Sequence, residues 1–329
     1  MLRVNLNFLM RRNWPRPLFT RRRLIVGLGL LAFGVAWASG RDGGQHLTLD
    51  LGGGVTMELA QVPAGTFIMG SPETEELRRY DETQHEVTIS KPFYIGIHEV
   101  TQARWKTVLG TDPSEFKGAD RPVEQVSWSD AVEFCNSLTE LVGKKHPEMK
   151  LKPYYTITVH RHGEEGQIVS VEVREHPGNR GFRLPTEAQW EYACRAGTTG
   201  PYAGTGRLGD MGWYDENTIR CLSAFWAIFR VDVVLNDDGS QRVGTKRPNA
   251  WGIYDMHGNV CEWCANWYGA YPEGRVTDPT GLPNGASRVV RGGSWDVDPN
   301  LCRSASRFGI SRLGRVNDVG FRVCLDLNE

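Results

Sequence analysis

Glycine and tryptophan together constrain the fold of this sequence more than any other feature. The chain has 38 glycines and 11 tryptophans among its 329 residues. Glycine adopts backbone conformations that other residues avoid, and large aromatic side chains bury a large apolar area each. The combination is typical of irregular backbone held in place by aromatic anchors. It predicts a loop-rich fold with little regular secondary structure and argues against a helical bundle. The strands and helices expected along the chain make the fold class α+β.

The charge balance limits the class of partner. The chain carries 38 Lys and Arg residues against 39 Asp and Glu residues, so its net charge is close to zero. Because no excess of positive charge is present, we expect no nucleic-acid partner. The hydrophobic fraction of 40% is sufficient for a sizeable core. The length allows one large domain or two small ones.

The first 38 residues have the features of an export signal. Arg21, Arg22 and Arg23 precede an uncharged run over residues 24–38, in which Ala-Trp-Ala ends at residue 38. A basic flank, a short apolar run and a small-x-small ending are typical of a cleavable signal peptide. The run is shorter than the ~20 residues of a membrane span. We therefore expect a periplasmic or extracellular protein that has no membrane segment after cleavage.

Two alternatives stay open for this segment. An uncleaved N-terminal anchor would have the same basic flank and apolar run. The consecutive arginines also resemble a twin-arginine signal, which would carry the folded protein, and the sequence does not separate this route from general secretion.

The rest of the chain reads as a linker and one domain. Residues 39–50 are polar and glycine-rich, which predicts a linker before a single compact domain over residues 51–329. Apolar residues that alternate between turn signals predict strands. These strands are expected at 55–59, 65–70, 85–90, 93–97, 231–235, 288–291 and 320–325, with the pair 85–90 and 93–97 side by side and a surface hairpin within 154–173.

Two helices are signalled by their N-terminal caps. Ser127 can cap a helix that has Cys135 on its buried face, because apolar residues recur there at helical spacing. Thr186 and Gln189 form a capping box at the start of a second helix, which is expected to stop at Gly197.

Eight short phrases occur in one order along the predicted domain. They lie at residues 63–71, 99–102, 122–128, 182–192, 248–256, 258–263, 291–295 and 320–322. Examples are Phe-Arg-Leu-Pro-Thr-Glu-Ala-Gln-Trp at 182–190, Gly-Asn-Val at 258–260 and Arg-Gly-Gly-Ser-Trp at 291–295. One phrase would be weak support, but eight in order resemble the sulfatase-modifying-factor, or formylglycine-generating enzyme, family over about 51–325.

The resemblance implies a loop-rich fold related to C-type lectins and an oxidase activity. Active members of the family oxidise a cysteine of a client sulfatase to formylglycine, using molecular oxygen and a copper ion held by two cysteines. Thiolate sulfur is the ligand that Cu(I) prefers.

The catalytic cysteine pair is incomplete in this sequence. In active members two cysteines follow the Gly-Gly-Ser phrase and are separated by four residues. An ungapped count places Val297 at the first position and Cys302 at the second, whereas a short deletion would make Cys302 a structural cysteine. Ser294 matches a serine of the oxygen pocket, although a serine after two glycines is also an ordinary turn residue. Cys302 and Ser294 are the candidate catalytic residues, and Cys261 replaces a tryptophan that borders the client groove.

The resemblance also implies bound calcium. Hard oxygen ligands on an irregular loop suit Ca²⁺. The first site would use the side chains of Asp255 and Glu262 with the carbonyls of Gly258 and Val260, and a second site would use Asn217 and Asp238. The alternative is that these acids are solvated loop charges.

Disulfides are the last feature that the resemblance implies. Extracellular members join two helix cysteines to cysteines near the C-terminus, which here suggests Cys194 with Cys302 and Cys135 with Cys324. The chain has seven cysteines, so an oxidising compartment leaves at least one thiol unpaired within the chain.

Two classes of function follow from these observations. A binding module that holds an exported protein or a small ligand fits the incomplete cysteine pair, because lectin-like relatives use the same fold for binding. The alternative is an oxygen-dependent oxidase, formylglycine-generating or related, that acts on an exported protein or metabolite. Some branches of the family work without the cysteine pair, which keeps this alternative open.

Overall fold

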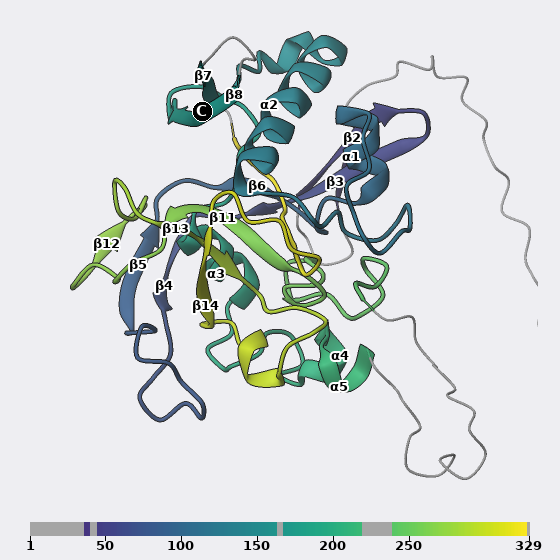
Figure 1. The fold of residues 1–329 in the computed structure, drawn as a ribbon. Helices are drawn as coiled ribbons and strands as arrows, with labels where there is room; N and C mark the ends of the chain where they lie inside the picture. The colour runs from purple at the N-terminus through teal and green to yellow at the C-terminus, as the bar shows by residue number, and fades with distance from the viewer. Residues whose placement is uncertain (1–35, 40–44, 163–166, 219–238, 328–329) are drawn as a thin grey trace, which may run out of the picture. The chain divides into compact units, whose positions relative to one another are not determined.

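The computed structural model describes residues 36–39, 45–162, 167–218 and 239–327 (Figure 1). They form short helices, short strands and many loops. In these ranges no helix is both long and apolar enough to cross a bilayer. The predicted signal lies outside the described residues up to residue 35, whereas its last three residues, 36–38, lie in a strand that pairs with residues 46–48. The predicted strand at 231–235 lies outside the described residues.

A five-stranded antiparallel sheet contains the start and the end of the described chain. Its order is β1-β2-β3-β6-β16. The strands are β1 (Ala36–Ser39), β2 (Gln45–Gly52), β3 (Val55–Val62), β6 (Phe93–Gly96) and β16 (Cys324–Asp326). The predicted linker over 39–50 is therefore wrong for residues 45–50. Leu47, Leu49 and Leu51 are buried on one side of β2, so this segment belongs to the domain.

The remaining strands form four smaller sheets. Their orders are β12-β5-β4, β14-β13-β11-β15, β10-β9 and β7-β8. Their strands are β4 (Gly65–Met69), β5 (His85–Ile89), β7 (Tyr155–His162), β8 (Gln167–Glu175), β9 (Gly212–Trp213), β10 (His257–Gly258), β11 (Cys261–Trp267), β12 (Val276–Thr277), β13 (Ser287–Arg291), β14 (Arg307–Ser311) and β15 (Val319–Gly320). The hairpin is confirmed. The expected pairing of 85–90 with 93–97 is wrong, because β5 pairs with β4 and β6 pairs with β3.

The two predicted helices begin where their caps indicated. The helices are α1 (Gln102–Leu109), α2 (Trp128–Lys145), α3 (Glu187–Arg195), α4 (Leu208–Met211) and α5 (Asp215–Thr218), with 3₁₀ turns η1 (Pro147–Met149) and η2 (Pro299–Cys302). Capping boxes join Ser127 to Asp130 at α2 and Thr186 to Gln189 at α3. Helix α3 ends when Ala196 adopts a left-handed conformation, one residue before Gly197.

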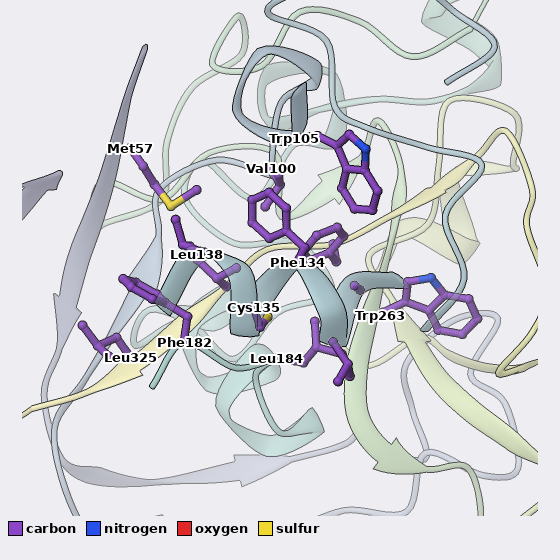
Figure 2. Close-up of a cluster of buried hydrophobic side chains, with 14 of the residues drawn as sticks. Met57, Val100, Trp105, Phe134, Cys135, Leu138, Phe182, Leu184, Trp263 and Leu325 are labelled. Atoms are coloured by element: carbon purple, nitrogen blue, oxygen red, sulfur yellow. The ribbon is translucent and has the colours of Figure 1, made fainter. Parts of the chain in front are cut away.

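An apolar core surrounds α2 (Figure 2). Trp105 of α1 stacks on Phe134 of α2 with ring centroids 5.5 Å apart, and Phe321 meets Phe134 edge-on at 5.4 Å. Cys135 and Leu138 of α2 are fully buried in the same cluster. We call this cluster the apolar core, since side chains without charge fill it.

A second buried region surrounds α3 and is held by ion pairs. Helix α3 contacts β4, β5, β11 and β13. Its Glu191 accepts from Arg195 Nε at 2.8 Å and forms a salt bridge with Arg291 of β13. Its Glu187 accepts from Arg307 of β14 through two hydrogen bonds of 2.7 Å. These five side chains are all buried, and we call them the ionic core.

Candidate functional site

Ser294 lies on a tight turn that follows β13. Gly292 and Gly293 have φ values of 95° and 71°, which lie in the left-handed region that favours glycine. A Cβ atom on Gly293 would lie 2.6 Å from Cys302 Sγ. Glycine at this position therefore lets η2 pack directly against the turn. Ser294 itself is fully buried, and its Oγ donates to Asp318 Oδ2 at 3.1 Å.

Cys302, the candidate catalytic cysteine, is a buried and protonated thiol. Burial, followed by the charge of Asp215, raises its pKa above the ordinary range, and a hydrogen bond from the Ser294 N–H offsets part of the rise. His257 Nδ1 lies 2.8 Å from the Cys302 carbonyl and acts as the donor, since a carbonyl only accepts. Burial lowers the pKa of His257 to about 4, so the ring is neutral at pH 7. A thiol without a cationic neighbour is not activated as a thiolate.

The fold brings a second thiol close to Cys302, and it is one that the sequence count did not find. Val297, at the expected position, has no thiol, and its carbonyl accepts from Asp215 N at 3.3 Å. Cys261 at the start of β11 donates its N–H to the Asp318 carbonyl at 2.8 Å. Burial raises the pKa of the Cys261 thiol well above its ordinary value, the charge of Asp318 adds to the rise, and a hydrogen bond with the Ser294 side chain offsets part of it. Cys261, Cys302 and Ser294 therefore form one buried group.

The disulfides implied by the family are not formed in this structure. The six cysteines within the described ranges are all buried and free, and Cys221 lies outside these ranges. Cys194 Sγ lies 3.7 Å from His257 Nε2 and 3.7 Å from Ser304 Oγ, so polar neighbours surround it instead of Cys302. Cys135 is buried in the apolar core. The members of both predicted pairs, Cys194 with Cys302 and Cys135 with Cys324, are therefore free thiols in this structure.

The two acids of the first predicted calcium set, Asp255 and Glu262, are both buried, and their charges interact. Asp255 Oδ2 accepts from Gly244 N at 2.7 Å, whereas its buried Oδ1 has no hydrogen-bond partner. Burial raises the pKa of Asp255 to about 6. Glu262 is bound on both oxygens by Arg322, through Nη2 and Nε at 2.6 Å each. Glu262 therefore already has a cationic partner, which the sequence did not predict.

Glu99 is a third buried carboxyl at this place. Its Oε1 accepts from Asn259 Nδ2 at 3.1 Å, and its Oε2 has no partner. Burial raises the pKa of Glu99 well above its ordinary value, and the charges of Asp255 and Glu262 raise it further. The sequence contained Glu99 within one of the eight phrases but gave no sign that it would face Asp255.

These residues fit a divalent cation in charge and donor type. The carboxyls of Glu99, Asp255 and Glu262 all interact with the Arg322 guanidinium, so two negative charges are left without a partner when all three are ionised. Unpartnered carboxylate oxygens are the donors that Ca²⁺ prefers. Within the described ranges no three His, Cys, Asp or Glu side chains are grouped to hold a metal ion by themselves. A cation here would need backbone carbonyls as well, such as those of Gly258 and Val260.

The second predicted calcium set is not assembled by the described residues. Asn217 Oδ1 accepts from Tyr214 N at 2.8 Å, and its Nδ2 donates to the Gly212 carbonyl at 3.0 Å. The side-chain amide of Asn217 therefore holds the backbone that leads into α5. Asp238 lies outside the described residues.

Two open clefts lie apart from these groups. One of about 700 Å³ is lined by Lys91, Arg183 and Asp326 among others. The other, of about 640 Å³, is lined by three tyrosines and two acids. Neither cleft contains a residue of the predicted catalytic or metal sets.

Comparison with known proteins decides the family. Residues 55–327 match the family described as the Sulfatase-modifying factor enzyme 1-like domain. The chain belongs to the sulfatase-modifying factor family. The match confirms the resemblance that the eight phrases indicated, and it places the buried Cys302 and Asp255 groups inside the family domain.

Relatives within the sulfatase-modifying factor family have different names. The chain is 36% identical to the "Chaperone protein LppX" of Paenibacillus barcinonensis over 247 residues, 72% of this chain and 81% of that protein. It is 37% identical to the formylglycine-generating enzyme of Streptomyces coelicolor over 157 residues, 44% of this chain and 47% of that enzyme. The family name alone therefore does not separate an oxidase from a protein-binding role.

A solved structure confirms the fold class. The Treponema denticola variable protein 1 has a TM-score of 0.69 and 28% identity, and the match covers 86% of this chain and 99% of that one. The predicted loop-rich α+β fold related to C-type lectins is thus correct for this member of the sulfatase-modifying factor family.

Proposed function

We propose that this chain is an exported, non-catalytic binding module that holds another protein. The observation that carries this proposal is the state of Cys302. Its thiol is buried behind Gly293, its pKa is raised, and the neighbouring His257 is neutral. The residue five positions earlier is Val297, which offers no thiolate. A module that binds without chemistry needs none of these groups to react.

The relatives favour a protein as the bound partner. Among the proteins to which the chain is similar, the Paenibacillus protein with 36% identity is named a chaperone. Chaperones act on other proteins, so the name of this relative favours a protein as the ligand of this chain as well. Export is part of the proposal and is supported by the basic flank and Ala-Trp-Ala ending of the first 38 residues. Calcium at Asp255 would stabilise the module by offsetting the buried negative charge.

One observation favours an oxidase as the second candidate. Cys261 and Cys302 are both hydrogen-bonded to Ser294, Cys261 through the Ser294 side chain and Cys302 through its backbone. Two thiolates are the ligand set that Cu(I) prefers. Cys261 would then replace the thiol that is missing at Val297.

Copper binding and oxygen uptake separate the two candidates. The purified chain is titrated with Cu(I) against a chromophoric chelator, and oxygen consumption is followed with a cysteine-containing sulfatase-motif peptide. The binding module predicts no copper-dependent oxygen uptake above that of the Cys302→Ala variant. Uptake that is lost in both Cys261→Ala and Cys302→Ala, but kept in the buried-thiol control Cys135→Ala, would establish the oxidase instead.

A further inference from the structure

The cleft of about 640 Å³ lies between two loops that are far apart in the sequence. Residues 80–85, which lead into β5, form one side, and residues 268–274, which follow β11, form the other. Its volume lies within the range of about 300–1,000 Å³ that is typical of ligand sites. Because the catalytic and calcium groups lie elsewhere, neither of them accounts for this cleft.

The side chains of the cleft combine aromatic rings with negative charge. Tyr80, Tyr268 and Tyr271 supply the rings, while Glu273 and Asp81 supply carboxylates, of which Asp81 already has an ion pair with Arg79 at 3.4 Å. The lining contains no Lys or Arg. Tyr80 is 85% exposed, so its ring face is accessible to a ligand. Aromatic faces next to carboxylates are the surroundings that an organic cation prefers.

Two of the three tyrosine rings of the cleft are held in place by contacts with the ionic core. Arg307 lies 4.9 Å from the ring centroid of Tyr268 and 4.0 Å from that of Tyr271, and Glu187 neutralises its charge. The Tyr271 hydroxyl donates to Glu187 Oε1 at 3.1 Å. These contacts fix two rings before any ligand arrives, so binding orders few side chains.

The hydrogen bond of Tyr268 strengthens this preference for a cation. Its hydroxyl donates to the Asp81 carboxylate. A phenol that donates to an anion has more negative charge on its ring face, which attracts a cation more strongly. Glu273 is exposed at the rim and can face the same cation from the solvent side.

We propose that this cleft binds an arginine- or lysine-bearing segment of the partner protein. The cation lies against Tyr80 and Tyr268, with Glu273 as its counter-charge. The inference rests on the proposed function in one respect, namely that the chain binds another protein, and it names the chemistry of the segment that is recognised.

The test uses the full chain and a fluorescent peptide of five Arg-Gly repeats, measured by fluorescence anisotropy. The same peptide with citrulline in place of arginine keeps the shape and removes the charge. We expect Tyr80→Ala to weaken binding of the arginine peptide roughly threefold to thirtyfold, the effect of losing one cation–π contact. Glu273→Gln should weaken it about threefold in 50 mM salt and less in 300 mM salt, because salt screens an exposed charge.

Two surface variants serve as controls. Glu140→Gln removes an exposed acid on α2, and Leu313→Ala removes an exposed apolar side chain outside the cleft. Both should bind the arginine peptide as the wild type does. All four variants change exposed side chains, and thermal melts confirm that they fold.

Three results would overturn the inference. They are equal binding of arginine and citrulline peptides, unchanged affinity in Tyr80→Ala, and displacement of the peptide by a neutral oligosaccharide. If the peptide does not bind and no oxygen uptake is found, the cleft assignment fails while the binding module stands. If the peptide binds through Tyr80 and copper-dependent oxygen uptake is found as well, the cleft stands and the non-catalytic proposal fails.

Discussion

Helices α2 and α3 both begin with a capping box, yet only α3 buries charged residues, and it buries them beside apolar residues of a second hydrophobic cluster. Eight residues of α2 are buried, and none of them is charged. In α3 the buried residues include Glu187, Glu191 and Arg195. Dispersion and hydrophobic burial stabilise the apolar core in small increments, so it tolerates changes that conserve volume. Removal of one partner in the ionic core leaves a buried charge alone, which is costly whatever the shape of the new side chain.

The largest effect is expected from Glu191→Gln. This change keeps the shape of the side chain but removes the charge that faces Arg195 and Arg291. The free energy of unfolding should fall by about 3–5 kcal/mol, measured by urea denaturation. A loss below ~1 kcal/mol would mean that the ionic core is as tolerant as the apolar one.

Calcium is expected to have the next largest effect. Ca²⁺ at a hundredfold excess over its dissociation constant should stabilise the folded state by about 2.7 kcal/mol. A chelator should therefore lower the melting temperature of the wild type. Asp255→Asn should remove most of this sensitivity, and Asp130→Asn, at an acid of the α2 cap, should keep it. Melting curves of the wild type that coincide with and without chelator would contradict the site.

A smaller effect is expected from Leu138→Met in the apolar core. The two side chains have similar volumes, and methionine adapts to irregular spaces. The loss of unfolding free energy should stay below about 1.5 kcal/mol, measured as for Glu191→Gln. If this change lowered the unfolding free energy as much as Glu191→Gln does, the two cores would be equally sensitive to substitution.

The smallest effects are expected at the caps, where the two helices are alike. Ser127→Ala and Thr186→Ala each remove a hydroxyl that accepts from a backbone N–H at 3.2 Å. Each should reduce the unfolding free energy by about 1 kcal/mol. Similar values in urea denaturation would show that the cores, and not the caps, distinguish α2 from α3.

The pH dependence of stability provides a separate test of the buried carboxyls. Burial raises the pKa of Asp255 from 3.8 to about 6 in the folded state, so the folded state binds the proton more tightly than the unfolded state. The contribution of Asp255 is fully present below about pH 4 and is lost as the pH rises through 6. In calcium-free buffer, the stability of the wild type relative to Asp255→Asn should therefore fall between pH 4 and pH 7. A difference that does not change with pH would show that Asp255 titrates normally.

Local signals predicted much of the fold. The N-terminal caps, Ser127 for α2 and the Thr186–Gln189 capping box for α3, located the two helices, and alternation located β3 and β4. The same alternation is present in β2, where Leu47, Leu49 and Leu51 are buried, but its polar neighbours suggested a linker. Strand β11 was not predicted because most of its residues are buried on both faces, so it has no alternation. Helix α1 is short, and its Thr101 cap was not recognised as a start signal.

The candidate site was harder to predict because its contacts join distant segments. The resemblance found Ser294, Cys302, Asp255 and Glu262. It did not show that Arg322 would bind Glu262 or that Cys261 would lie near Cys302. The tyrosine cleft joins residues 80–85 to 268–274, and no local pattern indicates such a pairing.

The pairing of β6 with β16 determines when this protein can finish folding. Residues 93–95 pair with residues 324–326, so the five-stranded sheet stays incomplete until nearly the whole domain has left the ribosome. Contacts between such distant segments form slowly, because the entropy of closing the loop is lost before the contact stabilises the chain. During this interval β6 exposes unpaired backbone groups that can pair with other chains. The risk of aggregation is therefore concentrated between the synthesis of β6 and the arrival of β16.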